Sequence, residues 1–306
     1  MTRVVIPLTA LLLLGLGEAP RPRITGVAHI ALYCRDIQAS RTYYTDFLGL
    51  GDPSEFKNVD GTLALTVIKV SDRHDIELLQ EREANTDRLA HIAFETDDAE
   101  GLRAYMKSRG MAVPPSVSQG RDGHVSFSVK DPDGHTVEFV QHAADGRMAR
   151  DRGTAMGPTA VSSDMRHVGI LVGAFEPALR FYGGVLGFTE TWRGSRDEKT
   201  LNWVNLRVPD GDDYLEFMLY GALPAPSERG SQHHLCLFVP DVERAAAKLA
   251  ERARAVGYTR PLEVRTGINR KRQLNVFDPD GTRTELMEPT TIDGKPAPSS
   301  TARPPR

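Results

Sequence analysis

The chain has 306 residues, of which 26% are charged, and its formal net charge is −3. This length allows two domains of ordinary size, each with a core of its own. The balanced charge, with no large basic face and no acidic tail, argues against nucleic acid as a partner. A small-molecule substrate is the expected partner. The protein is expected to be a monomer or a homodimer that contacts no membrane beyond its first segment.

Residues 1–19 have the pattern of a secretory signal peptide. Arg3 precedes an apolar run that is too short to span a bilayer comfortably as a helix. Gly17 and Ala19 are small enough for a cleavage site, although Pro20 disfavours cleavage directly after Ala19. We therefore expect export to the periplasm or the extracellular space. The alternatives are an uncleaved membrane anchor and a wrongly assigned start codon.

Two similar halves follow, residues 24–142 and residues 164–288. Residues 143–163 between them are rich in Gly, Ala, Ser and Arg, which predicts a linker. Residues 289–306 are rich in Pro and Ser and are predicted to be a flexible tail, because they cannot bury enough apolar surface to become ordered. A disulfide between Cys34 and Cys236 is not expected, since the two lie in different repeats.

Each half divides into two quarters with the same predicted order of a strand, a helix and three further strands. The first and third quarters begin with apolar strands at 27–33 and 166–172. Asp36 is placed to cap the next helix in one quarter, and Pro177 lies in the first helical turn of the other.

The second and fourth quarters begin with strands at 89–94 and 233–238, followed by predicted helices that aspartates cap. Both quarters close with the turn Asp-Pro-Asp-Gly, at 131–134 and 278–281. Proline presets φ in such a turn and glycine takes its left-handed position. Each quarter therefore reads βαβββ.

One further pattern repeats four times: a histidine on an apolar strand, followed by a glutamate on another apolar strand. The pairs are His29 and Glu77, His91 and Glu138, His167 and Glu216, and His234 and Glu285, separated by 48, 47, 49 and 51 residues by subtraction of the residue numbers. His233 competes with His234 for the fourth position, but alignment with the strand around His91 favours His234.

A lone carboxylate between core-forming residues is costly unless it is paired or bound to a metal. A single strand histidine or glutamate is most often structural or solvent-exposed, but four pairs at matched offsets favour inward-facing ligands. Histidine nitrogen and glutamate oxygen together are typical ligands of divalent transition metals. The four pairs supply two sites of two His and two Glu, for zinc, nickel, iron, manganese or cobalt. Ligands pair within each half or are shared across the halves.

The chain resembles the vicinal oxygen chelate superfamily, which includes glyoxalase I, methylmalonyl-CoA epimerase, extradiol dioxygenases and bleomycin-resistance proteins. The resemblance rests on the strand histidines, on the helices ending Tyr-Tyr-x-x-Phe-Leu-Gly-Leu and Phe-Tyr-x-x-Val-Leu-Gly-Phe, and on the two Asp-Pro-Asp-Gly-x-x-x-Glu hairpins. It implies an α+β fold, in which four βαβββ units form two tandem glyoxalase-like domains with curled mixed sheets around metal sites.

The ligand set resembles that of glyoxalase-like isomerases and lyases. The resemblance implies a metal that acts as a Lewis acid and stabilises an enediolate, with Glu138 and Glu285 as the bases, although both could also be permanent ligands. A glutathione substrate is not expected for an exported protein. The run from Arg270 to Arg272 could hold an anionic substrate, but a solvated loop is the favoured interpretation.

Two other functions stay open. An extradiol-type dioxygenase would use His167, His234 and Glu285, but residues 273–276 lack the second-sphere His and Tyr of that class, and Glu216 has no role there. The third candidate is a non-catalytic small-molecule binding protein of the same fold, which would bind a ligand tightly without turnover.

Overall fold

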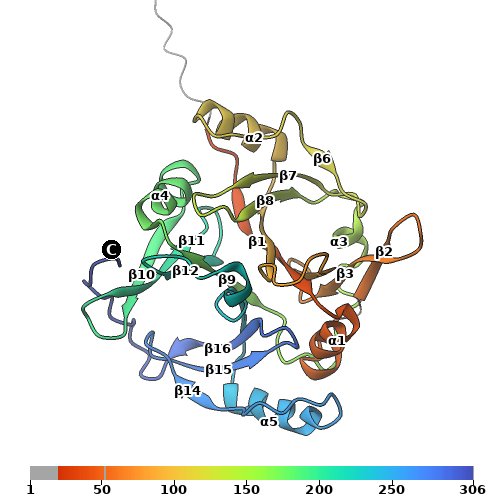
Figure 1. Cartoon of the computed structure of the whole chain (residues 1–306), viewed down its shortest axis with the longest axis vertical. Coiled ribbons are helices and arrows are strands. Elements are labelled where there is room, and N and C mark those ends of the chain that lie inside the picture. The colour runs from red at the N-terminus through yellow and green to blue at the C-terminus, as the bar shows by residue number, and fades with distance from the viewer. Residues whose placement is uncertain (1–19, 52, 306) are drawn as a thin grey trace, which may run out of the picture.

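In the computed structural model, which describes residues 20–51 and 53–305, each half of the chain forms a curled eight-stranded sheet (Figure 1). The predicted signal peptide, residues 1–19, lies outside the described residues. Within the described part of the chain, no helix is long and apolar enough to cross a membrane.

The first sheet has the strand order β2-β3-β4-β1-β5-β8-β7-β6. In chain order its half contains β1 Ile24–Cys34, α1 Ile37–Thr42, the π-helical turn η1 Tyr43–Phe47, β2 Pro53–Lys57, β3 Leu63–Lys69, β4 Asp75–Gln80, β5 Leu89–Thr96, α2 Ala99–Ser108, β6 Ser118–Gln119, β7 Val125–Lys130 and β8 Thr136–Gln141.

The second sheet repeats this order as β10-β11-β12-β9-β13-β16-β15-β14. After the connecting helix α3 Arg147–Arg150, its half contains β9 Met165–Val172, α4 Phe175–Leu179, the π-helical turn η2 Arg180–Val185, β10 Thr189–Ser195, β11 Leu201–Arg207, β12 Tyr214–Leu219, the 3₁₀ turn η3 Pro226–Glu228, β13 His234–Phe238, α5 Val242–Ala253, β14 Val264–Thr266, β15 Lys271–Phe277 and β16 Arg283–Thr291.

Both sheets are assembled from two βαβββ units, as predicted. The first strand of each unit pairs in parallel with its last strand, and the two first strands pair antiparallel at the sheet centre. The four strands that carry His and Glu are therefore neighbours in each sheet. The α+β architecture of four repeated units is confirmed.

The helix caps and hairpin turns that the sequence predicted are present at the expected positions. The carboxylate of Asp36 accepts hydrogen bonds from two backbone N–H groups of α1, and Asp98 and Asp241 each accept one in α2 and α5. In the hairpins, Gly134 and Gly281 have φ of 87° and 86°, the left-handed conformation that glycine adopts without steric cost. The Asp-Pro-Asp-Gly signal thus forms the predicted turns.

The two halves share one continuous hydrophobic core, where the chain length also allowed two separate ones. It lies on the faces of the sheets opposite the histidines, beneath the helices. Phe94 packs edge-on against Phe188 with ring centroids 5.0 Å apart, and Phe47 stacks on Tyr258 at 4.4 Å. Because these pairs join residues of different halves, neither half buries its apolar face alone.

Each Asp-Pro-Asp-Gly hairpin is also held by the other half. The hydroxyl of Tyr182 donates to Asp131 at 3.0 Å, and that of Tyr44 donates to Asp278 at 3.4 Å. The second aspartate of each hairpin accepts backbone N–H groups of the opposite half. The tyrosines of the two helical motifs and the hairpin aspartates therefore form a reciprocal clasp.

The linker is folded against the first sheet. It contains α3, and the buried ammonium of Lys69 donates to Asp72 at 2.7 Å, to the carbonyl of Thr154 at 2.9 Å and to the carbonyl of Asp151. A buried ammonium requires such partners, and the linker supplies two of the three.

The structure corrects the expectation of a flexible tail at 289–306. Strand β16 extends into it, and Pro298 accepts a hydrogen bond from the indole of Trp192 at 3.0 Å. Farther on, the carbonyl of Arg303 accepts from the backbone N–H of Leu201 at 2.8 Å. The tail is ordered because backbone groups along β10 and β11 offer it partners, which composition alone does not reveal.

Candidate metal centres

In the first half, strand register alone brings four candidate ligands together. Glu77 and His91 both lie opposite Ala31 of β1, one on each side. His29 and Glu138 lie on the neighbouring row, on either side of a residue of β5. Residues that face one another across paired strands project from the same side of the sheet, so all four side chains share one face.

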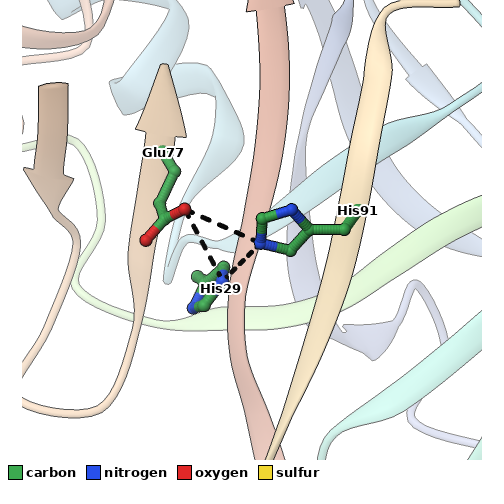
Figure 2. A group of neighbouring side chains, drawn as sticks. All are labelled: His29, Glu77 and His91. Carbon is green, nitrogen blue, oxygen red and sulfur yellow. Dashed lines mark hydrogen bonds and ion pairs between the residues drawn. The ribbon is translucent and has the colours of Figure 1, made fainter. Parts of the chain in front are cut away.

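Figure 2 shows the imidazoles of His29 and His91 and the carboxylate of Glu77 converging on one point. The two Nε2 atoms are 2.8 Å apart, and Glu77 Oε2 lies 3.8 Å from His29 Nε2 and 3.6 Å from His91 Nε2. Glu138 Oε2 lies 3.2 Å from both. Ligand atoms at about 2.0–2.2 Å from one ion are roughly 3–4 Å from each other. The cluster therefore fits a divalent metal.

The second half repeats this arrangement on β9, β12, β13 and β16. His167 Nε2 and His234 Nε2 are 3.1 Å apart. Glu216 Oε2 lies 3.3 Å from His234 Nε2, and Glu285 Oε2 lies 3.5 Å from His167 Nε2. Of the two pairings that the sequence left open, the structure brings the ligands together within each half.

Supporting contacts orient His234 for ligation. Its Nδ1 lies 2.9 Å from the carbonyl of Gln232 and 2.8 Å from Nη2 of Arg283; in the tautomer whose Nδ1–H donates to the carbonyl, the Nε2 lone pair is free for a metal. The ring also lies directly over Gly169, where a Cβ would approach ring atom Cε1 to 1.9 Å. His233 is buried elsewhere, 3.5 Å from Asp87. The structure therefore places His234, not its neighbour, at the site.

The two clusters differ in electrostatics. Burial alone would lower the pKa of His29, but Glu77 and Glu138 outweigh it and raise that pKa to about 9. Burial also opposes ionisation of Glu138, yet contacts with His29 and His91 lower its pKa strongly. Without a metal, the first cluster is thus an imidazolium–carboxylate network.

The second cluster is held in the opposite protonation state. Burial lowers the pKa of His167 well below its usual range, and burial together with Arg283 lowers that of His234 to about 3. Burial and the neighbouring Glu216 raise the pKa of Glu285. The imidazoles of the second half are therefore neutral, the form that binds a metal.

One register position contributes to this difference, alongside the positive charge of Arg283 next to His234. Asp75 lies opposite His29 in the first sheet, and Tyr214 lies opposite His167 in the second. Asp75 adds negative charge and is itself paired with the buried Arg147 of the linker. The ring of Tyr214 packs on His167 with centroids 4.5 Å apart and adds no charge.

Only the second cluster has amide side chains at the positions opposite its glutamates. Asn205 faces Glu216 and Asn275 faces Glu285, and each amide oxygen is buried with no hydrogen-bond partner in the described part of the chain. The first half has a valine and a serine at the matching positions. The second site thus has spare hydrogen-bonding capacity next to the candidate metal.

A cavity of about 320 Å³ reaches both glutamates of the second half. Besides Glu216 and Glu285 it is lined by Trp192, Arg196, Trp203, Arg265, Thr266, Gly267, Ile268, Asn269, Gln273 and Arg283. Sequence reasoning missed these residues because nearly all of them lie on loops or on strands other than the ligand-bearing ones. Arg283, two residues before Glu285, could have been found by strand alternation.

The run from Arg270 to Arg272 is not the solvated loop that the sequence favoured. Lys271 and Arg272 begin β15, and Lys271 lies over the ring of Phe238, 5.0 Å from its centroid. Arg270 pairs with Asp293 at 2.8 Å, and Arg272 pairs with a glutamate of α5. Cys34 and Cys236 are buried and free.

Comparison with known proteins agrees with this geometry. The family model described as "Glyoxalase/Bleomycin resistance protein/Dioxygenase superfamily" matches residues 26–139 and 164–286. YwbC of Bacillus subtilis (strain 168), described as uncharacterized, is 29% identical over 122 residues, which are 38% of this chain and 96% of YwbC. Lactoylglutathione lyase of Schizosaccharomyces pombe is 30% identical over 94 residues, but these are only 27% of the lyase and 30% of this chain.

Solved structures of two kinds share the fold. The Mn(II)-bound glyoxalase from Novosphingobium aromaticivorans has a TM-score of 0.64 at 19% identity, covering 92% of this chain and 88% of that one. An extradiol ring-cleaving dioxygenase from B. fuscum has a TM-score of 0.66 at 20% identity, covering 94% and 78%. At these identities the likeness concerns the fold alone.

Proposed function

Because the chain belongs to the glyoxalase/bleomycin resistance protein/dioxygenase superfamily, we propose that it is a divalent-metal-dependent enzyme with glyoxalase-like isomerase or lyase chemistry. Its substrate would be a small compound with two adjacent oxygens. The observation that carries the proposal is the donor geometry: each sheet gathers two imidazoles and two carboxylates with donor atoms 2.8–3.8 Å apart in the closest pairs.

His167, Glu216, His234 and Glu285 would hold one ion, and His29, Glu77, His91 and Glu138 the other. A bound divalent ion would supply Lewis-acid polarisation of a substrate oxygen. We place the reaction at the second half, because a cavity reaches its glutamates and its two unpartnered asparagine oxygens lie beside them. Glu285 would accept the proton from the carbon next to the polarised oxygen, and Glu138 would do so if the first half is also active.

The experiment counts metal ions in protein purified without a histidine tag. We expect two divalent ions per chain by inductively coupled plasma mass spectrometry, and one in each of the double variants His29→Ala/His91→Ala and His167→Ala/His234→Ala. Protein that holds no divalent ion, and shows no thermal shift with zinc, nickel, manganese or iron, would sink the proposal. Metal with tight ligand binding but no turnover would leave a binding protein.

A second candidate is an extradiol-type dioxygenase. It is favoured by the grouping of one donor atom each from His167, His234 and Glu285 within 4.8 Å of one another. Against it, Glu216 supplies a fourth donor 3.3 Å from His234, and residues 273–276 contain no His or Tyr. Oxygen uptake with a catechol panel after anaerobic Fe(II) loading would favour ring cleavage, and no uptake across the panel would remove it.

We also propose that the protein works outside the cytosol, on the strength of the pattern at residues 1–19. Cell fractionation would find the protein in the periplasm or the medium, and amino-terminal sequencing would find a start beyond residue 15. A full-length chain in the cytosolic fraction would contradict this proposal without touching the metal chemistry.

A further inference from the structure

Three arginines of the second-half cavity, Arg196, Arg265 and Arg283, have no carboxylate within 4.0 Å in the described part of the chain. We refer to them as the arginine cluster. Two other arginines of the same half are paired with acids: Arg193 pairs with Glu190, and Arg270 pairs with Asp293 at 2.8 Å. Uncompensated guanidinium groups that line a cavity are suited to bidentate recognition of a carboxylate.

The charge balance of the cavity points the same way. Glu216 and Glu285 are the acidic residues of its lining, and three arginines outnumber them. A divalent cation held by the glutamates would neutralise their charge and leave the arginines unopposed. Arg283 Nη2 already lies 2.8 Å from His234 Nδ1, whereas Arg283 Nε is buried with no hydrogen-bond partner in the described part of the chain and remains able to donate to a ligand. The metal-loaded cavity is therefore strongly cationic.

Two tryptophan rings form part of the cavity wall. Trp192 and Trp203 line it, and the guanidinium of Arg196 lies 5.0 Å from the ring centroid of Trp203. The ring of Trp192 lies against Gly194, where a Cβ would approach it to 2.2 Å, and its indole N–H is fixed by the carbonyl of Pro298. Two positioned indoles favour a planar group between metal and solvent.

The first half does not repeat this surface. By strand register, Leu65 stands where the second half has Trp203, and Thr136 stands where it has Arg283. Arg147 of the linker, which is buried against the first half, is already paired with Asp75. The features that suit an anion are thus confined to one of the two sites.

We propose that the second-half cavity takes a planar substrate that carries a carboxylate in addition to its adjacent oxygens, with the carboxylate held by the arginine cluster. This inference rests on the proposed function, since the metal would hold the oxygens. One anion would bind per chain, even though two metal ions do.

The test uses intrinsic fluorescence, because the only two tryptophans of the chain, Trp192 and Trp203, line this cavity. The probes are 3,4-dihydroxybenzoate and 3,4-dihydroxybenzamide, which share adjacent oxygens and a ring but differ by one charge. They are titrated without oxygen into zinc-loaded and metal-free protein of known metal content. We expect the benzoate to bind about tenfold or more tightly than the amide, at one site per chain, with a preference that weakens at high salt.

The double variant Arg196→Gln/Arg265→Gln, which keeps Arg283, should reduce that preference several-fold while leaving amide affinity unchanged. Arg272→Gln is the matched control, since Arg272 lies on the opposite face of β15 from the cavity residue Gln273 and pairs with Glu243. Equal affinity of wild-type protein for both probes, or quenching by neither in metal-loaded protein, overturns the inference. A benzoate preference in protein that takes up no metal supports the arginine cluster while removing the proposed metal chemistry.

Discussion

Gly169→Ala is the sharpest perturbation of the second candidate metal centre, because residue 169 is not itself a proposed ligand and affects the site only through its steric contact with His234. A Cβ at this position would lie 1.9 Å from Cε1 of His234, and 2.6 Å from its Nε2. Ordinary carbon–carbon contacts begin near 3.5 Å, so the imidazole has to retreat by more than about 1 Å. Ligand atoms must stay within about 0.2 Å of their bonding distance, and the retreat therefore removes His234 from coordination.

The expected result is loss of one metal ion per chain, with second-site affinity lowered by more than the roughly 10–100-fold that follows loss of a supporting residue. Overpacking also costs about 1–3 kcal/mol of stability. The matched control is Ala31→Gly, because Ala31 occupies the same register position in the first half. It should keep both ions and cost about 0.5–1 kcal/mol.

Metal content by mass spectrometry and competitive titration against a chromophoric chelator measure both effects. Retention of two ions per chain at wild-type affinity in Gly169→Ala would refute the placement of His234 at a metal. If Ala31→Gly also loses an ion, metal loss in these variants would have to be attributed to a change in the strand backbone and not to a steric contact with the histidine ring.

Three further predictions follow from the same structure. Burial raises the pKa of Asp278 to about 7, above the roughly 3.9 of an unfolded aspartate. The folded state therefore binds this proton more tightly than the unfolded state does. The unfolding free energy should consequently fall as pH rises from about 4 to about 7, by at most roughly 4 kcal/mol. Asp278→Asn keeps the acceptor for the hairpin N–H groups and should flatten that part of the denaturation profile, whereas an unchanged slope would assign it to other groups. Lys69→Met leaves the linker carbonyls of Asp151 and Thr154 without their ammonium and should cost about 1–3 kcal/mol while opening the linker to trypsin; cleavage at wild-type rate would contradict the role given to Lys69. Glu285→Gln should lower kcat by roughly 10²–10⁴-fold with the fold kept. Glu138→Gln, its counterpart in the first half, should lower kcat far less, and equal losses would show that both halves turn over.

The repeated elements could be predicted because their signals are local. Alternation around His29 and Glu77 sets which way each side chain faces, and the parallel pairing of the first and last strand of a unit then brings the pair together. The Asp-Pro-Asp-Gly turns are likewise encoded within four residues. Repetition of the His and Glu pattern identified all eight candidate ligands of the two clusters, and alignment of the fourth repeat with the strand around His91 favoured His234 over its neighbour.

What the sequence did not reveal depends on contacts between distant segments. No local pattern tells that the hydroxyl of Tyr182 reaches Asp131, or that the tail finds Trp192 and Leu201 along β10 and β11. The contrast between the two sites is also non-local. Asp75 faces one histidine and Tyr214 the other, and Arg283 lies beside the second cluster where the first half has Thr136. A strand register is needed to see that these positions correspond.

Because of the reciprocal clasp of hairpins and tyrosines, each half has two separate roles: it gathers its own proposed metal ligands, and it stabilises the fold of the other half. All contacts among the proposed ligands stay within one sheet, whereas the clasp and the shared core join both halves. A substitution that removes a proposed metal ligand from one half therefore leaves intact the contacts through which that half stabilises the other. After a duplication, one copy is free to lose or change its reaction while selection for folding still keeps it in the gene. The unequal surroundings of the two histidine clusters are the outcome that such a history would leave.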